Sequence, residues 1–465
     1  MKDIIIRNAS AHNLKNVSVR IPLGKFVAVV GKSGSGKSSF VYDVIYRASQ
    51  GSVAGARVSG VPRTYALSQK VKAERKMSVG ETNLARLDAL LQKAKKGELL
   101  IVDEPCAGMA EEDRTRVLGD LRRAVENGVS MIVVEHAKDI IAGADHVIEF
   151  GPEAGAGGGE IVFQGSIEEF KKAATPTSRY VFSEQAGVVD HERKPTRKTE
   201  LMRRKMLIIK GITEHCFKKA ELAIPLGGVV CITGRIGAGK STMLSIAYGA
   251  LFKGKNAWER RQGFASVSGK TYVRRSYLVD QKPLSSVRTS TPATYLGIWG
   301  AIRKVYAALP ESKKARLRPA HFSSNTEEGR KSSAKAKEAR YKGVSVYDVL
   351  AMTVDEAASV FSDIPLVARK LRFLQEAGLG YLSLGQGSGT LSGGEAQRVR
   401  LAKILSKKLG DRCIYILDTP SRGLHLSDLP VLMKILQKIV DKNNTVLIAE
   451  NREEIVQNCD HVIRL

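Results

Sequence analysis

Two segments of this chain have the residue types and spacing that bind nucleotide phosphates. They read GKSGSGKS at 31–38 and GRIGAGKS at 234–241, and each follows a hydrophobic run. Both fit G-x-x-x-x-G-K-[ST], whose glycines let backbone N–H groups face the phosphates at the N-terminus of a helix. The lysine would reach the β- and γ-phosphates, and the serine after it would bind Mg²⁺. Simple glycine-rich turns are the alternative, but two matches in strand–loop–helix context give it little weight.

The two loops predict a set of nucleotide-contacting residues. From the first loop these are Gly31, Ser33, Gly34, Gly36, Lys37, Ser38 and Ser39, and from the second Gly234, Gly237, Gly239, Lys240, Ser241 and Thr242. We expect Ser38 and Ser241 to be the Mg²⁺ ligands among them, and ATP with Mg²⁺ to be the bound species.

Two later hydrophobic runs each end in an aspartate, and they differ at the next residue. The run LLIVD at 99–103 is followed by Glu104, whereas CIYILD at 413–418 is followed by Thr419. An aspartate at the end of a buried strand can organise Mg²⁺, and a glutamate directly after it can deprotonate an attacking water. The sequence therefore predicts two nucleotide sites, of which only the one with Glu104 is built for hydrolysis.

The order of these motifs shows an internal duplication. An IPLG segment precedes each phosphate loop, at 21–24 and at 224–227, and the strand and helix patterns repeat after it. Alternating strands and helices indicate an α/β core. We expect a first nucleotide-binding domain at 1–190, a basic linker at 191–205 and a second nucleotide-binding domain at 206–465. The second domain contains a helical, basic insert at about 296–390.

Composition restricts the partners and the compartment. The formal net charge of +27 favours nucleic acid as a partner over a merely solubilising surface. None of the five cysteines forms a C-x-x-C pair, which predicts a reducing compartment without disulfides or zinc. No apolar run reaches the length of a membrane span and no signal peptide is recognised, so we expect a cytoplasmic, nucleoid-associated protein without membrane contact.

A third motif narrows the assignment. The segment LSGGEAQR at 391–398 matches the LSGGQ/E signature of ABC ATPases, in which the serine hydroxyl and glycine N–H groups bind a γ-phosphate held by another phosphate loop. The first half has MSVGE at 77–81, which retains Ser78 and Gly80 but has Val79 in place of a glycine. A Cβ at Val79 should hinder close approach of the backbone to phosphate.

Further segments resemble one branch of these ATPases, the UvrA family of bacterial excinuclease subunits. The similar segments are NLKNV, VVEH, ADHVI, VDQ, TPATY, RYKG and GLGY, at 13–17, 133–136, 144–148, 279–281, 291–295, 340–343 and 378–381. The resemblance implies two tandem ABC-type nucleotide-binding domains packed head-to-tail, each with a helical signature subdomain. It also implies double-stranded DNA as a partner. UvrA-like proteins dimerise, which makes a homodimer an open expectation.

Two departures from UvrA limit what the resemblance implies. Only about eight residues separate Gln69 from Ser78, where UvrA carries its UvrB-binding and DNA-insertion domains. The segment 322–337 lacks the C-x-x-C pairs of the UvrA zinc modules and is rich in serine, lysine and alanine. The chain therefore resembles a minimal paralogue of the family, and the resemblance does not imply an excinuclease role.

In ABC folds each phosphate loop faces the signature of the other half, which implies one complete composite site here. Asp103 and Gln69 would hold Mg²⁺ with Ser38, Glu104 would act on water, and His136 would stabilise charge on the γ-phosphate. The residues assigned to this site beside the first phosphate loop are Gln69, Asp103, Glu104, His136, Ser392, Gly393 and Gly394.

The second composite site is incomplete at three positions. It has Thr419 for the glutamate, Asn451 for the histidine and Val79 in the signature that would close it. It retains the Mg²⁺-binding and phosphate-binding residues, namely Lys240, Ser241, Gln281 and Asp418, with Ser78 and Gly80 from the opposite signature. We predict that it binds Mg-ATP and that loss of the base slows turnover by roughly 10²–10⁴. Replacement of the base by Glu450 or Glu395 is not favoured, because neither ends the aspartate strand.

Basic residues in the insert are the candidates for DNA contact. The candidates are Arg316, Arg318, Arg330, Lys331, Lys335 and Lys337, although a solvated loop suits 323–337 equally well. The leading interpretation is an ATP-dependent, DNA-binding ABC ATPase. The alternatives are an ATPase switch that regulates a partner effector protein, in a defence or mobile-element system, and a soluble resistance or ribosome-associated ATPase. A transporter subunit fits least.

Overall fold

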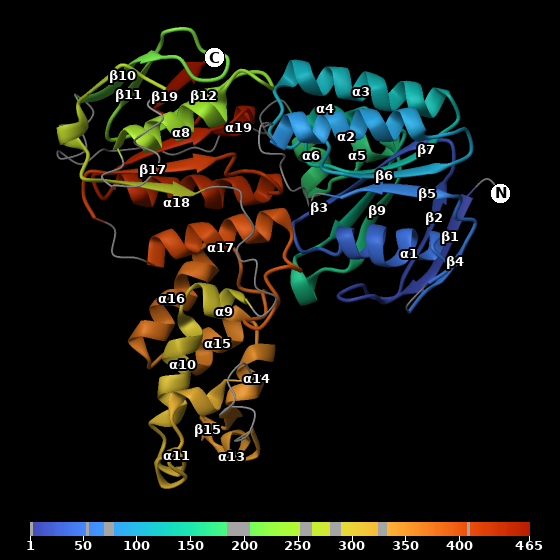
Figure 1. Ribbon diagram of the computed structural model, residues 1–465. Helices are drawn as coiled ribbons and strands as arrows, with labels where there is room; N and C mark the ends of the chain where they lie inside the picture. Colours follow the sequence, from blue (N-terminus) through green and yellow to red (C-terminus); the bar gives the residue numbers. More distant parts are fainter. Residues whose placement is uncertain are drawn as a thin grey trace. The chain divides into compact units, whose positions relative to one another are not determined.

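The chain folds into two compact units. The computed structural model describes residues 3–52, 55–68, 79–183, 205–251, 263–279, 290–323, 333–406 and 410–465. Unit 1 comprises Met1–Asp280 and Gly410–Leu465, and unit 2 comprises Gln281–Leu409. Unit 1 holds the sheets of both halves of the duplication, and unit 2 holds the signature at 391–398 (Figure 1).

The first half is built on a six-stranded sheet in the order β5-β6-β7-β3-β8-β9, parallel except for β9, with a small antiparallel sheet β2-β1-β4 beside it. Its strands are β1 (Asp3–Ala9), β2 (Val17–Pro22), β3 (Phe26–Gly31), β4 (Arg57–Ser59), β5 (Thr64–Leu67), β6 (Leu99–Asp103), β7 (Ser130–Val134), β8 (His146–Gly151) and β9 (Glu160–Ser166). Its helices are η1 (Ser39–Tyr46), α1 (Arg47–Ser49), α2 (Val79–Lys93), α3 (Glu111–Glu126), α4 (Lys138–Ala142), η2 (Gly155–Gly157), α5 (Ile167–Lys172) and α6 (Pro176–Phe182).

Both faces of this sheet are covered, which explains why its strands are hydrophobic throughout. Val27 and Val29 of β3 pack with Phe40 of η1 on one face. Ala28 and Val30 of the same strand belong to the cluster on the other face, which α2 and α3 cover (Figure 1). Because all six residues of β3 are buried, the phosphate loop that follows it starts from a fixed position.

The second half repeats this plan in a parallel sheet of order β14-β17-β18-β12-β19, with the antiparallel sheet β11-β10-β13. Its strands are β10 (Met206–Ile212), β11 (Ala220–Pro225), β12 (Val229–Thr233), β13 (Ser266–Ser268), β14 (Arg275–Val279), β17 (Cys413–Asp418), β18 (Thr445–Ala449) and β19 (His461–Arg464). Its helices are α8 (Lys240–Leu251), η4 (Lys270–Tyr272), η6 (Leu426–Asp428), α18 (Leu429–Val440) and α19 (Glu453–Val456). The predicted α/β duplication is confirmed.

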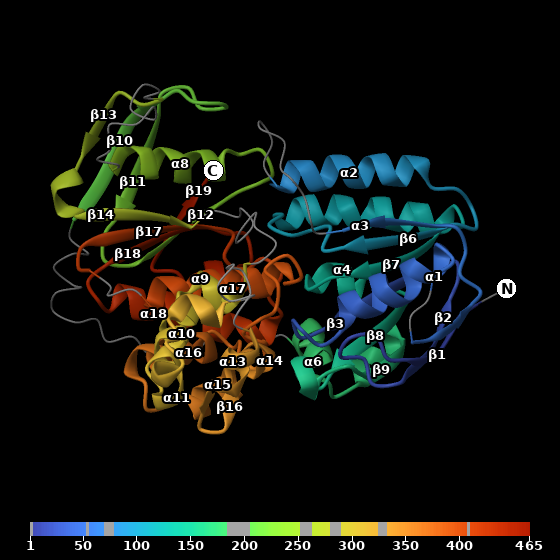
Figure 2. The same cartoon turned by 60° about the horizontal axis from the view of Figure 1, so that its bottom comes forward.

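Unit 2 is mainly helical, as Figure 2 also shows. Its elements are α9 (Pro292–Tyr295), α10 (Ile298–Ala307), α11 (Pro310–Lys314), η5 (Pro319–Phe322), α13 (Ser333–Glu338), β15 (Arg340–Tyr341), β16 (Val344–Ser345), α14 (Val346–Ala351), α15 (Val354–Val360), α16 (Pro365–Glu376) and α17 (Gly393–Ser406). Across the described part of the chain, none of the helices combines the length and apolar character needed to cross a bilayer.

An aromatic cluster forms part of the core of unit 2. Tyr306 is completely buried, and its ring centroid lies 5.9 Å from that of Phe322 and 6.4 Å from that of Tyr341. Tyr341 stacks in turn on Phe361, with centroids 5.4 Å apart. The Tyr306 hydroxyl donates a hydrogen bond of 2.8 Å to the carbonyl oxygen of Val344. This bond connects helix α10 to the antiparallel pair of strands β15 and β16.

Substitutions of Tyr306 should separate the packing of this ring from its hydrogen bond. Tyr306→Ala should destabilise unit 2 by about 3–5 kcal/mol, because a fully buried ring is lost. Tyr306→Phe keeps the ring and should cost only about 1 kcal/mol. Amide hydrogen exchange of α10 and α16 would measure both, and equal protection in Tyr306→Ala and the parent protein would contradict the assignment of Tyr306 to the core.

Candidate nucleotide-binding sites

The two phosphate loops have the same geometry. Each follows an interior strand of its sheet, β3 or β12, and each lysine folds back onto its own loop. The Lys37 ammonium donates to the carbonyl oxygens of Gly31 and Lys32, both at 2.7 Å. Lys240 donates to the two corresponding carbonyls, at 2.6 and 2.9 Å. Both lysines are thus held at the mouth of a loop, where an anionic phosphate can replace the carbonyls as partner.

Two glycines of the first loop are required by its backbone. Gly31 has φ +130°, and a Cβ there would lie 2.1 Å from the carbonyl oxygen of Phe150. Gly36 has φ +106°, and a Cβ there would lie 2.9 Å from the side chain of Leu14. The loop therefore has the close, left-handed curvature that turns backbone N–H groups toward a phosphate.

Two of the Mg²⁺ ligands predicted for the second site, Ser241 and Asp418, lie together. The Ser241 hydroxyl donates to Asp418 Oδ2 at 3.0 Å. A hydroxyl beside a carboxylate is a donor set suited to Mg²⁺. Burial raises the pKa of Asp418, and a cation at this position would offset that cost. In the first half Ser38 directly precedes η1, and the buried Asp103 ends β6.

Glu104 and Thr419 occupy equivalent backbone positions. Glu104 has φ 47° and Thr419 has φ 45°, both left-handed values that are uncommon outside glycine. The Glu104 N–H donates to the carbonyl of Val134 at 2.8 Å, and the Thr419 N–H donates to the carbonyl of Ala449 at 3.0 Å. The two sites therefore have the same turn after the aspartate strand and differ there in the side chain.

His136 and Asn451 are also equivalent, but their side chains are held differently. His136 Nε2 lies 3.8 Å from Glu104 Oε1, and the buried His136 Nδ1 has no hydrogen-bond partner among the described residues. Asn451 makes three hydrogen bonds: its Oδ1 accepts from Thr233 Oγ1 and from the Gly234 N–H, at 2.8 and 3.0 Å, and its Nδ2 donates to the carbonyl of Gly108 at 2.9 Å. Asn451 thus ties the second phosphate loop to the first half of the chain.

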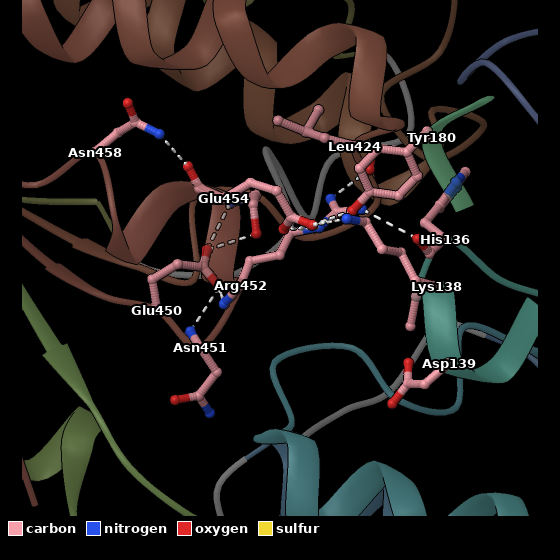
Figure 3. Close-up of polar contacts among 12 residues, drawn as sticks. His136, Lys138, Asp139, Tyr180, Leu424, Glu450, Asn451, Arg452, Glu454 and Asn458 are labelled. Atoms are coloured by element: carbon pink, nitrogen blue, oxygen red, sulfur yellow. Dashed lines mark hydrogen bonds and ion pairs between the residues drawn. The ribbon is translucent and has the colours of Figure 1, made fainter. Parts of the chain in front are cut away.

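The two glutamates considered as replacement bases both accept hydrogen bonds within their own units. Glu450 is buried and accepts hydrogen bonds from Ser421, Asn451 and Arg452, so it organises the turn after β18 (Figure 3). Glu395 lies in unit 2, where it bonds the N–H of Ser392 at 2.8 Å and the hydroxyl of Tyr381 at 2.9 Å. Both carboxylates therefore have structural partners.

The signature segments lie at helix N-termini, as anion-binding segments do. In unit 2, Ser392 precedes α17, with Gly393 and Gly394 in its first turn, and its hydroxyl accepts from the Glu395 N–H at 3.2 Å. In unit 1, Gly80 is in the first turn of α2, and a Cβ there would lie 3.4 Å from Cγ1 of Ile236 in the second phosphate loop. The first signature therefore lies against the second loop, in the head-to-tail sense.

Some of the residues predicted from the sequence have no described position. Gln69, Ser78, Gln281, Arg330 and Lys331 lie outside the described residues. The other DNA candidates, all exposed in unit 2, are Arg316, Arg318, Lys335 and Lys337.

Comparison with known proteins identifies the family. UvrABC system protein A of Pasteurella multocida is 35% identical over 424 residues, which are 84% of this chain and 44% of that protein. UvrABC system protein A of Thermus thermophilus is 35% identical over 427 residues, 85% of this chain and 44% of that protein. A family model described as "ABC transporter" matches residues 217–422. The chain is a UvrA-like ABC ATPase.

The solved structures agree with this family on the fold. The crystal structure of UvrA2 from Deinococcus radiodurans superimposes with a TM-score of 0.86, covering 100% of this chain and 95% of that one at 20% identity. The UvrA-like chain spans less than half the length of the two curated relatives, so their complete activities do not transfer with the fold.

The loops that follow the two aspartate strands were missed as site residues in the sequence. The Ser33 hydroxyl of the first phosphate loop donates to the carbonyl of Gly423 at 2.6 Å, and Asn451 of the second half bonds Gly108. Each loop thus reaches the site of the other half. The loop at the complete site reads SRGLH at 421–425, whereas the loop at the incomplete site reads CAGMA at 106–110. Self-comparison beyond the aspartate strands would have revealed this fourth difference.

A network of charged residues joins the halves beside the complete site (Figure 3). Arg452 donates to the carbonyls of Leu424 and His136, at 2.7 and 3.3 Å. Glu454 pairs with Lys138 at 3.6 Å and accepts a hydrogen bond from the hydroxyl of Tyr180. These residues line a cavity of about 200 Å³ that also contacts Glu104 and Arg422.

The surroundings of Glu104 oppose its ionisation. Burial, with the neighbouring charges of Asp103 and Glu135, raises the pKa of Glu104 to about 8, against the lowering influence of Arg422 and Lys37. Burial and the charges of Lys37 and Arg452 hold the pKa of His136 well below its ordinary value. Without bound ligands, a protonated Glu104 and a neutral His136 are therefore favoured at neutral pH.

The raised pKa of Glu104 predicts a pH-dependent stability of the nucleotide- and Mg²⁺-free protein. The folded state binds the extra proton between the ordinary pKa of 4.5 and about 8, so Glu104 lowers stability progressively as pH rises through that window. Glu104→Gln removes this effect, so at pH 8.5 its free energy of unfolding should exceed that of the parent protein by an amount on the order of a few kcal/mol. Its melting temperature should be higher accordingly, and the difference should shrink toward pH 5.

Thermal melts at both pH values would measure this difference. Glu126→Gln, which removes an exposed carboxylate from α3, is the matched control and should leave the parent curves unchanged. A stabilisation by Glu104→Gln that is equal at pH 5 and pH 8.5 would contradict the assigned electrostatics.

Proposed function

We propose that this UvrA-like chain binds duplex DNA under the control of ATP, hydrolyses ATP at the site with Glu104 and holds ATP at the site with Thr419. The equivalence of Glu104 and Thr419 carries the proposal. Their φ values agree within 2°, from 47° and 45°, and both N–H groups bond the adjacent strand. The backbone thus presents a carboxylate in one site and a threonine hydroxyl in the other.

At the complete site, each side chain has a separate task. Lys37 would exchange its two loop carbonyls for phosphate oxygens, and the curved backbone of the loop would supply N–H donors. Glu104 would orient a water molecule and accept its proton, and His136 would stabilise charge on the terminal phosphate. Asp103, Ser38 and Gln69 would hold Mg²⁺, which neutralises phosphate charge when bound. Ser392, Gly393 and Gly394 would close the site from the second half.

At the incomplete site, the side chains support retention rather than turnover. Lys240, Ser241 and Asp418 provide phosphate and Mg²⁺ contacts, but Thr419 has no basic group suited to activating water. Asn451 is engaged by three hydrogen bonds, which link the second phosphate loop to Gly108 of the first half. Nucleotide in this site would reinforce an existing connection between the halves.

The basic surface supports DNA as the partner. The chain has a formal net charge of +27, and the four described candidate residues in unit 2 are all exposed. Lysine and arginine in such positions contact phosphates without reading sequence. The UvrA relatives support the same partner by family, although the chain spans only part of their length.

Exchanging the two residues after the aspartate strands tests the assignment of the sites. Glu104→Gln should reduce steady-state ATP hydrolysis by at least about 10²-fold, because the proposed general base is lost while the turn is retained. Thr419→Glu should change turnover by less than about threefold, since Asn451 and Val79 remain. A coupled phosphate-release assay would measure both. Full activity in Glu104→Gln would refute the assignment.

Salt dependence tests the DNA surface. The pair Arg316→Ala and Arg318→Ala should weaken duplex binding equally across sequences and reduce the slope of log K against log salt by about 2. Fluorescence anisotropy between 50 and 200 mM salt, as a typical range, would measure the slope. Lys210→Ala, at an exposed position on β10, is the control. An unchanged slope in the double variant would remove these two arginines from the DNA surface.

A further inference from the structure

A histidine from the second half packs against the predicted phosphate-contacting histidine of the first. His425 lies in the loop after β17, and its ring centroid is 5.6 Å from that of His136, with the planes 77° apart. His425 is 2% exposed and His136 is 6% exposed. Edge-to-face packing of two buried rings fixes the orientation of each by the other. The orientation of His136 therefore depends on what holds His425.

A chain of hydrogen bonds holds His425 in one orientation. The Ser427 N–H donates to His425 Nδ1 at 3.3 Å, which leaves the proton on Nε2 when the ring is neutral. His425 Nε2 lies 3.2 Å from Thr177 Oγ1, and the Thr177 hydroxyl donates to Glu149 Oε1. Burial, with the charges of Lys37 and Arg452, lowers the pKa of His425 to about 3, which agrees with a neutral ring.

The far end of this chain lies beside the first phosphate loop. Glu149 belongs to β8 and pairs with Val30, the residue directly before Gly31. Thr177 belongs to α6 and is 1% exposed, and Glu149 is 3% exposed. The contacts Glu149–Thr177–His425–His136 therefore link two residues beside the first phosphate loop. Glu149, Thr177 and His136 belong to the first half of the chain, and His425 belongs to the second.

The incomplete site lacks two members of this arrangement, the counterparts of His425 and Glu149. Alignment of the loops after the aspartate strands places Ala110 where the second half has His425. The strand register places Arg464 beside Thr233, as Glu149 lies beside Val30. Since a methyl group at Ala110 can provide neither a hydrogen bond nor a ring edge, the arrangement serves only the site with Glu104.

We infer that His425 is a positioning residue for ATP hydrolysis, held by Thr177 and Glu149, which orients His136 toward the terminal phosphate of nucleotide in the first site. The inference rests on the proposed function, because it assigns a role within the same hydrolytic site. It makes turnover at that site depend on the second half of the chain through a side chain, in addition to the signature. We call the contacts Glu149–Thr177–His425–His136 the positioning relay. The relay affects the rate of hydrolysis, whereas the phosphate loop binds the nucleotide.

Substitutions of Thr177 test the relay without removing a ring. Thr177→Val keeps the shape but removes the hydroxyl, and kcat should fall roughly tenfold while KM for ATP changes less than about twofold. Thr177→Ser restores the hydroxyl and should recover most of the lost kcat. Thr175→Val is the matched control, because Thr175 caps the same helix by accepting from the Ser178 N–H at 3.1 Å. It should lower the melting temperature but leave kcat unchanged.

A double-mutant cycle completes the test. His425→Phe keeps a ring edge against His136 but loses the bond to Thr177, so adding Thr177→Val to it should cause little further loss of kcat. Additive losses would overturn the relay, as would a kcat in Thr177→Val equal to that of Thr175→Val. If Glu104→Gln abolishes turnover while these variants do not alter it, the relay alone is wrong. If Glu104→Gln retains turnover, the proposed site itself is wrong, and the relay with it.

Discussion

The turn after each aspartate strand is the constraint on which the two sites depend. Its first residue is left-handed without being glycine, and its N–H is bonded to the carbonyl of the neighbouring strand, at Glu104 and at Thr419 alike. Such a conformation carries a cost that the surrounding sheet must offset. The sheet thus fixes the backbone from which the side chain extends, whether that side chain is a glutamate or a threonine. Replacement of one residue can then change the side chain at this turn while leaving the aspartate, the phosphate loop and the strand order in place.

The two sites also differ in how the side chain at the histidine position is held. Around Asn451, three hydrogen bonds leave little freedom, and the phosphate loop is connected to Gly108 of the opposite half. Around His136, the ring is surrounded by cations and another ring, and one of its buried nitrogens lacks a partner among the described atoms. The side chain at this position is therefore held by hydrogen bonds in one site and by packing against a second ring in the other.

Local patterns in the sequence predicted those features of the sites that are formed by neighbouring residues. The phosphate loops, the aspartate strands and the difference between Glu104 and Thr419 are each contained in a few consecutive residues. Ser33 and Gly423 are in contact although they are 390 positions apart in the sequence. No local sequence pattern predicts such a contact. For the same reason the roles of Thr177 and His425, which are 248 positions apart, became apparent only when the strands had placed them together. Glu450 was set aside on its position in the sequence alone, and its hydrogen bonds to Ser421 and Asn451 add a structural role that the sequence did not indicate.

The position of unit 2 in the chain affects the order of folding. Strands β14 and β17 are neighbours in the second sheet, yet Gln281–Leu409 separates them along the sequence. The first sheet is complete once residue 166 has been synthesised, whereas the second must wait until all of unit 2 has emerged from the ribosome. Long separation between paired strands slows folding and prolongs exposure of unpaired edges. During synthesis, the half with Glu104 would therefore be folded first, while the loop at 421–425 that contacts its phosphate loop is made late.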